Sequence, residues 1–345
     1  MTDNKFNIKD TILAVDINEA TQAVKENRFK DAINLLKISL VEHPDHIDSL
    51  YLAGVCSRYL KNFADATKYI ESLLLHAPDM GRAYQELAHI NRDMGNEEKS
   101  ISNYRQACEL NPALISSWVS LYEYFKKNNN KPALDHAAEQ ITKLKSLPNM
   151  LLYIDQVMNE GRLGVAELKV REFLKKNPTH TYAMSQLSEI ANRLGHFDDA
   201  ELLLEKAVQF NPDDGELRMK YALVLRKKQK FAKTMEQVNI LCDKYPDNLA
   251  YQAQKASEIM QNGQHEDAIG LFDDILNKNP HNFSTHTSKG HALKTLGKTS
   301  DAIKSYQSAY KIRPDHGEAF FSLANLKTYS FSDPELTNMK EQIKR

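Results

Sequence analysis

Prolines recur along this chain of 345 residues with a period of 34. Every gap in the series is 34 residues except the gap of 66 between Pro112 and Pro178. Its members are Pro44, Pro78, Pro112, Pro178, Pro212, Pro246, Pro280 and Pro314. A fixed period of this length is typical of repeat architectures, in which one supersecondary unit recurs and stacks on its neighbours. The series therefore predicts an array of similar units.

Three further columns follow the same register once proline is set at position 32. Position 8 holds a small residue: Ala20, Gly54, Ala88, Ser188, Ala222, Ala256, Gly290 and Ala324. Position 20 holds alanine in six repeats: Ala32, Ala66, Ala166, Ala200, Ala268 and Ala302. Position 24 is apolar in every full repeat, from Leu36 to Tyr306. Small residues in two columns predict two helices that cross closely, with an apolar partner between them.

This pattern resembles the tetratricopeptide repeat, over about residues 13 to 330. Full repeats start at residues 13, 47, 81, 115, 147, 181, 215, 249 and 283, and a partial tenth starts at Gly317. The resemblance implies an all-α fold, a right-handed α-solenoid of about nine helical hairpins plus a C-terminal partial repeat. The residues agree with it. Between Ser185 and Pro212, apolar side chains recur every three or four residues, Gly195 suits the turn, and Asn211-Pro212 suits a helix end.

The register also predicts how the chain is divided. Residues 1–12 are expected to be a tail, 13–146 repeats 1 to 4, 147–316 repeats 5 to 9, and 317–345 the partial repeat with a last helix. Repeat 4 is irregular because Tyr122 and Leu134 stand where small residues are expected, and it ends two residues early. We expect a kink or an altered superhelical angle there.

Composition limits the class of protein. The formal net charge is -1, so the overall charge favours neither nucleic acid nor an anionic membrane as a partner. Three cysteines without short spacing predict a reducing compartment, which we take to be the cytoplasm. No secretory signal and no membrane span are expected. The histidines mostly occupy turns and the acidic pairs lie on helix surfaces, so we expect no metal and no catalytic residue.

One stretch imitates a phosphate-binding loop. Gly297-Lys298-Thr299 matches the end of the pattern G-x-x-x-x-G-K-[ST], in which backbone N–H groups cradle phosphates. The pattern also needs a glycine at residue 292, where the chain has Ala292, and a helix rather than a strand is expected before it. Since position 15 of other repeats also holds glycine, we interpret Gly297 as a turn residue and expect no nucleotide site.

A basic stripe is the candidate binding site. In this fold the first helix of each repeat lines a concave groove, and position 12 faces inward. The basic residues at that position are Arg58, Arg92, Lys126, Arg226 and Lys294. We expect them to bind an extended peptide or protein segment that carries acidic residues. The alternative is that these side chains are solvated helix ends paired with their neighbours.

A second resemblance concerns the C-terminal end. His316 to Leu336, "HGEAFFSLANLKTYSFSDPEL", is similar to the junction in bacterial proteins that join tetratricopeptide repeats to a sulfotransferase domain. That family implies a following catalytic domain that uses the sulfuryl donor PAPS. The chain itself has no donor loop, so it is expected to need no cofactor and to be the repeat part of such an enzyme. The alternatives are a scaffold without a linked enzyme and a stand-alone assembly module.

Overall fold

The computed structural model describes the backbone of residues 8–343 and the side chains of residues 17–342. Within that part of the chain all regular structure is helical, in twenty α-helices and no strand. The predicted all-α fold is therefore confirmed. Of the predicted tail, residues 1–7 lie outside the described residues, and residues 8–12 belong to α1.

The contacts divide the chain into two compact units, residues 1–177 and 178–345. The first holds α1 (Ile8–Lys25), α2 (Phe29–Glu42), α3 (Ile47–Tyr59), α4 (Phe63–His76), α5 (Gly81–Asp93), α6 (Glu97–Leu110), α7 (Ile115–Lys127), α8 (Lys131–Lys145), α9 (Asn149–Asn159) and α10 (Leu163–Lys176). The second holds α11 (Thr181–Arg193), α12 (Phe197–Phe210), α13 (Gly215–Lys227), α14 (Phe231–Lys244), α15 (Leu249–Gln261), α16 (His265–Lys278), α17 (Phe283–Thr295), α18 (Thr299–Ile312), α19 (Gly317–Ala324) and α20 (Asp333–Ile343). The boundary that the repeat irregularity suggests, at residues 146/147, lies inside the first unit and stays a prediction.

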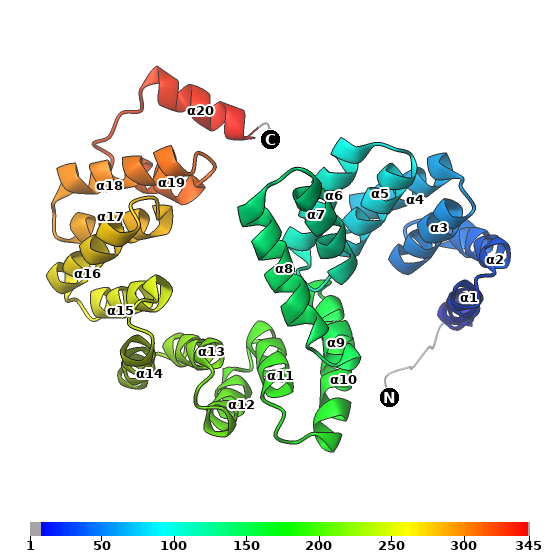
Figure 1. Ribbon diagram of the computed structural model, residues 1–345, viewed down its shortest axis with the longest axis horizontal. Helices are drawn as coiled ribbons and strands as arrows, with labels where there is room; N and C mark the ends of the chain where they lie inside the picture. The colour runs from blue at the N-terminus through cyan, green and yellow to red at the C-terminus, as the bar shows by residue number, and fades with distance from the viewer. Residues whose placement is uncertain (1–7, 344–345) are drawn as a thin grey trace, which may run out of the picture. The chain divides into compact units, whose positions relative to one another are not determined.

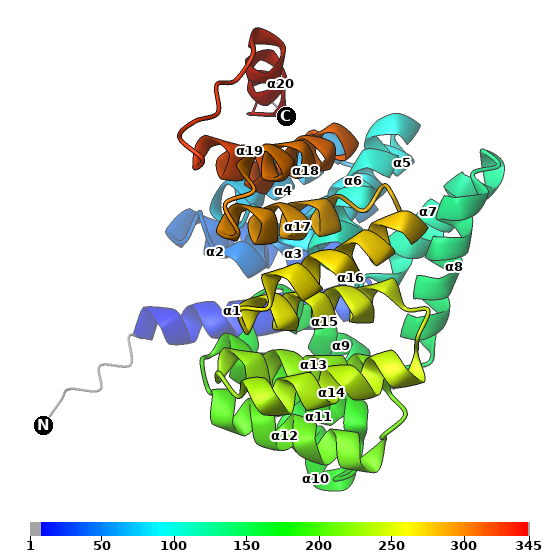
Figure 2. The same cartoon turned by 90° about the vertical axis from the view of Figure 1, so that its left-hand side faces the viewer.

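Each unit is built from helical hairpins. Every odd-numbered helix from α1 to α17 packs on the even-numbered helix that follows it (Figure 1). Within the second unit, each hairpin also packs on the next, from α12 against α13 to α18 against α19 (Figure 2). The small-residue columns lie at these crossings: Ala88, for example, is fully buried in one cluster with Tyr104. Close packing of the two columns is what the sequence pattern predicts.

The turn inside each hairpin has a left-handed residue at position 15. It is a glycine in five repeats: Gly95, Gly161, Gly195, Gly263 and Gly297. It is Asn27, Lys61, Asn129 or Gln229 in the other four. Gly297, with a φ of 75°, thus closes the α17–α18 turn, and a helix precedes it. The interpretation of Gly297 as a turn residue is confirmed.

A lysine in this conformation predicts a stabilising substitution. Lys61 has a φ of 61°, which strains a side chain but not a glycine. We expect Lys61→Gly to raise the free energy of unfolding by about 1 kcal/mol. Trp118, the one tryptophan of the sequence, lies in the same unit and reports urea denaturation by fluorescence.

The matched control is Lys68→Gly, an exposed site inside α4, which should lower stability by about 1 kcal/mol. If both glycines lower the urea midpoint, the turn at Lys61 is not strained.

The turns between hairpins are capped by polar side chains at position 34 in most repeats. The side chains that accept an N–H of the next helix are those of His46, His180, Asp214, Asn248 and Asn282. Such caps stabilise a helix start by about 1 kcal/mol. Repeats 2 and 3 differ, since Met80 and Leu114 stand there without a side-chain cap, and both are buried.

Repeat 5 lies beside these two turns. Within the first unit, α9 has almost no contact with α8, whereas each earlier hairpin packs on the next. Its residues instead reach the turns between earlier hairpins: Asn111 Nδ2 donates to the Gln156 carbonyl at 3.1 Å, and Gln156 Nε2 donates to the Ala113 carbonyl at 3.1 Å. Arg82 Nη2 also donates to Glu160 Oε2 at 2.8 Å. The α9–α10 hairpin therefore folds back on the turn edge of repeats 2 and 3.

The C-terminal end of the second unit is held by one carboxylate. Glu335 accepts hydrogen bonds from the Tyr310 hydroxyl at 2.6 Å, the Tyr329 hydroxyl at 2.5 Å and the Ser332 backbone N–H at 2.8 Å. Burial alone would raise the Glu335 pKa, but these hydrogen bonds lower it to about 2. The Glu335 side chain thus reaches back to Ser332, which precedes α20, as the glutamate of a capping box does. The last helix is thus tied to α18 through Tyr310.

Candidate peptide-binding groove

The five basic residues of the predicted stripe have different surroundings. Arg58 is largely buried, with a side chain 11% exposed, whereas the Arg92 side chain is 52% exposed. Arg226 is intermediate at 30%. Lys126 and Lys294 are exposed. The stripe is therefore not one uniform basic surface.

Arg58 lies in an ion pair beneath the surface. Its Nε is 2.5 Å from Glu86 Oε1, and the Glu86 side chain is 4% exposed. A second carboxylate, Asp93 Oδ2, lies 3.3 Å from Arg58 Nη1. Burial raises the pKa of the Glu86 carboxyl, and the Arg58 guanidinium opposes that rise. Arg58 is engaged on two sides, so its contribution here is to stability.

Asp93 also joins Arg58 to Arg92. The carboxylate of Asp93 accepts from Arg92 Nη2 at 3.0 Å, and Arg92 Nη1 donates to the Tyr104 hydroxyl at 3.4 Å. The same hydroxyl lies 2.7 Å from His89 Nδ1. Burial, followed by the charges of Arg58 and Arg92, lowers the His89 pKa to about 4, so the imidazole is neutral at pH 7. This network fixes where Arg92 lies.

Arg92 lies at the rim of a hollow of about 560 Å³ in the first unit. The hollow lies between α6 and α7, and Ile101, Val119 and Tyr124 supply its apolar surface. Its charged lining is Arg92, Lys127, Glu97 and Glu123. Lys127 Nζ lies 2.8 Å from Glu97 Oε1, so one cation is already paired with one anion. The hollow is therefore balanced in charge.

Arg226 lines a hollow of about 570 Å³ in the second unit, mostly between α11 and α13. Its apolar lining is Leu204, Leu223, Val224 and Phe231, and its charged lining is Lys220, Arg226, Lys227 and Glu189. The lining carries three cations and one carboxylate, which makes this hollow basic, although Lys220 Nζ lies 3.4 Å from Glu216 Oε1 on its own helix. Arg226 Nη1 is 3.5 Å from the buried Glu258 carboxylate, whereas Lys227 Nζ donates to the neutral Asn192 Oδ1 at 2.9 Å. Lys227 Nζ also lies 5.7 Å from the centroid of the Phe197 ring, so its partners here are uncharged.

The structure does not place two residues of the predicted set in one hollow. Arg92 and Arg226 line the two hollows, and neither Lys126 nor Lys294 lines them. Periodicity did not identify Lys220 and Lys227, which stand at positions 6 and 13 of their repeat. Position 13 is adjacent to the stripe, so a broader scan of the first helices could have found Lys227.

No helix in the described part of the chain is long and apolar enough to cross a membrane.

Comparison with known proteins supports the repeat assignment. Residues 81–114 and 283–316 match the tetratricopeptide repeat family model. These segments coincide with repeats 3 and 9 of the 34-residue register. The chain therefore carries tetratricopeptide repeats, and its fold is an α-solenoid of such hairpins.

A curated relative from Dictyostelium discoideum, a "DnaJ homolog subfamily C member 7 homolog", is 22% identical over 236 residues. The match covers 66% of this chain and 39% of the relative, so the chain spans about two fifths of that protein's length.

Among solved structures, YrrB, described as a TPR protein with an unusual peptide-binding site, is 15% identical with a TM-score of 0.42, over 54% of this chain and 96% of YrrB. A MamA structure from Desulfovibrio magneticus RS-1 is 12% identical with a TM-score of 0.43, over 49% of this chain and 98% of MamA.

Proposed function

We propose that this tetratricopeptide-repeat scaffold for protein–protein interaction binds an extended segment that carries acidic residues around an apolar one. The observation that carries the proposal is the basic hollow of the second unit, where Lys220, Arg226 and Lys227 surround an apolar surface. An apolar side chain of the ligand would fill the hollow, and flanking carboxylates would meet the lysines. Because exposed ion pairs contribute only about 0.2–1 kcal/mol each, binding is expected to be moderate and weakened by salt.

The test begins with a peptide-display selection on the whole chain. We expect enriched peptides to carry Asp or Glu on either side of Leu or Met. In the double variant Lys220→Gln/Lys227→Gln, the affinity for a selected peptide should fall about tenfold at low salt, since two exposed contacts are lost. Arg226 is left intact because removing it would leave the buried Glu258 carboxylate without its cation.

The matched control removes a lysine elsewhere in the same unit. Lys304 is well exposed, and its ion pair within the described residues is with Asp301 on its own helix, so Lys304→Gln should bind like the parent. If the double variant also binds like the parent at low salt, the basic hollow is a solvated surface and the proposal is wrong.

A finer proposal concerns a linked enzyme. The resemblance of His316–Leu336 to a sulfotransferase junction supports a role as the partner-recruiting part of a PAPS-dependent enzyme in the cytoplasm. The free cysteines Cys56, Cys108 and Cys242 suit a reducing compartment. The test is to read the gene beyond the codon for Arg345 and to assay its full product for sulfuryl transfer. If the product ends at Arg345, or if it transfers no sulfate, the proposed link to a sulfotransferase is wrong and only the scaffold role remains.

A further inference from the structure

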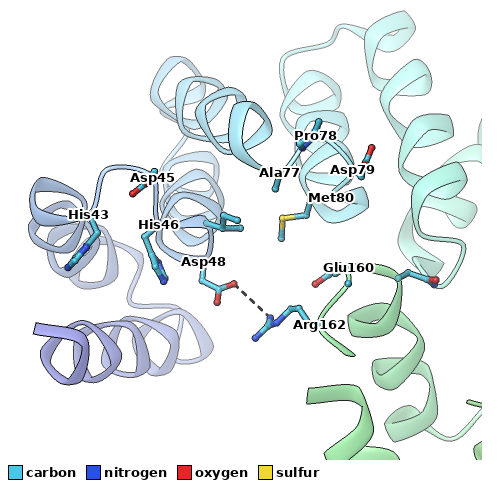
Figure 3. A pocket seen from close by; sticks show the side chains of 13 residues that line it. His43, Asp45, His46, Asp48, Ala77, Pro78, Asp79, Met80, Glu160 and Arg162 are labelled. Atoms are coloured by element: carbon cyan, nitrogen blue, oxygen red, sulfur yellow. Dashed lines mark ion pairs between the residues drawn. The ribbon is translucent and has the colours of Figure 1, made fainter. Parts of the chain in front are cut away.

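A larger hollow lies away from the groove, at the turn edge of the first unit. It measures about 760 Å³ and lies between the turns that follow repeats 1 and 2 and the α9–α10 turn of repeat 5 (Figure 3). Its lining is His43, Asp45, His46, Ile47, Asp48, Ala77, Pro78, Asp79, Met80, Asn159, Glu160, Gly161 and Arg162. The hollow exists because repeat 5 folds back instead of extending the stack.

The wall that repeat 5 supplies is firmly held. The Glu160 side chain is only 2% exposed and pairs with Arg82 of α5. Asn159 Nδ2 donates to Asn111 Oδ1 at 3.3 Å, beside the Asn111–Gln156 hydrogen bond. A buried ion pair and several amide hydrogen bonds across segments far apart in sequence make this a fixed contact. The hollow is therefore bounded by packed structure on both sides.

Its charge is strongly one-sided. Its acidic lining residues are Asp45, Asp48, Asp79 and Glu160; Glu160 is already paired with Arg82, so the other three carboxylates stand against the single guanidinium of Arg162. Arg162 reaches across to Asp48, with Nη1 3.8 Å from Oδ1, and both side chains are about two fifths exposed (Figure 3). A pair this long and this exposed is weak and open to exchange. Asp45 and Asp79 are exposed.

The neutral part of the lining suits the stem of a basic side chain. Ala77, Pro78 and Met80 lie on the side of the hollow that faces Arg162 (Figure 3). The aliphatic stems of lysine and arginine pack on such surfaces while their charged ends reach carboxylates. Metal ions are a poor alternative, because no group of three or more His, Cys, Asp or Glu side chains within the described residues could hold one.

We propose that this hollow is a second binding site, for a protein segment bearing arginine or lysine, whose cation replaces Arg162 on Asp48. The charge complementarity, and the Arg162 guanidinium that already lies 3.8 Å from Asp48, favour arginine. The site shares no lining residue with the basic hollow of the second unit, because it is made by turns and by repeat 5 of the first unit. The scaffold would then hold two segments of opposite charge.

The test uses the whole chain and a fluorescein-labelled probe, the peptide Gly-Arg-Gly-Arg-Gly with blocked ends, followed by fluorescence anisotropy at low salt. We expect saturable binding. Removing two exposed carboxylates, in Asp45→Asn/Asp79→Asn, should weaken it about fivefold to tenfold. Arg162→Gln should strengthen it about threefold, because Asp48 loses its internal competitor.

The matched control, Glu266→Gln/Asp274→Asn, removes two carboxylates from α16 of the second unit and should bind like the parent. A probe that does not saturate the parent, a control that weakens binding as much as the Asp45/Asp79 pair, or an Arg162→Gln variant that binds more weakly would each overturn the proposal. An acid-bearing groove peptide should bind all these variants equally, so this site and the groove can fail separately.

Discussion

Replacing Arg58 with leucine should lower the free energy of unfolding of the first unit by about 3–5 kcal/mol. The Glu86 carboxylate is 4% exposed, and without Arg58 it would be buried without a cation. Removing one partner of a buried pair is costly because the remaining charge must be desolvated alone or protonated. Urea denaturation followed by Trp118 fluorescence measures the loss, since Trp118 lies in α7 of the same unit.

The double variant Arg58→Leu/Glu86→Leu is the informative control. With both charges gone, most of the lost stability should return, because an apolar pair of similar size is often as stable as a buried ion pair. Asp93 is 30% exposed and can be solvated when Arg58 is absent. If Arg58→Leu alone lowers the free energy of unfolding by less than about 1 kcal/mol, the Arg58–Glu86 pair behaves like an ordinary surface ion pair. Arg58 would then again be a candidate groove residue.

The repeat register could be predicted well because it is a local property. Prolines, small residues and apolar residues at fixed positions define each hairpin, and the family model matches repeats 3 and 9 at the predicted boundaries. The left-handed turn residue at position 15 follows the same rule even where it is Lys61 or Gln229. Each of these features depends on contacts within one repeat or with the next.

Which basic residues of the stripe are buried and which are exposed could not be predicted in the same way. Spacing places Arg58 and Arg92 at the same position of successive repeats, yet one is buried and the other exposed. The difference comes from Glu86, which stands at position 6 of the following repeat and meets Arg58 only after the hairpins have packed. Whether a charged side chain is free in such a groove depends on the neighbouring repeat as much as on its own position.

One feature of the sequence accompanies the fold-back of repeat 5, and the search for periodicity did not include it. Met80 and Leu114 occupy a position where other repeats carry a capping side chain, and repeat 5 contacts residues beside both of them. The direction of α9 is set by the short link Ser146-Leu147-Pro148 and by contacts with residues more than forty positions away. Those contacts leave no period in the sequence.

In the second unit, Gly290→Val should lower the free energy of unfolding by about 3 kcal/mol. A Cβ on Gly290 would lie 2.5–2.9 Å from three ring atoms of Tyr306, whose side chain is fully buried and whose hydroxyl lies 3.0 Å from His291 Nδ1. The ring has no room to turn away, so α17 and α18 must separate. Circular dichroism during urea denaturation would measure the loss, and hydrogen exchange would place it in these two helices.

Alanine at the same position separates the clash from other effects of losing glycine. Gly290→Ala should cost less, about 1–2 kcal/mol, because alanine favours the helix by about 1 kcal/mol over glycine. Repeat 3 already packs Ala88 in one cluster with Tyr104, so a tyrosine can be accommodated beside a methyl group when the hairpin is built for it. If the clash is the cause, Tyr306→Leu combined with Gly290→Ala should cost less than the sum of the two single substitutions. Strict additivity, or a Gly290→Val variant as stable as the parent, would show that Tyr306 does not fix the distance between these two helices.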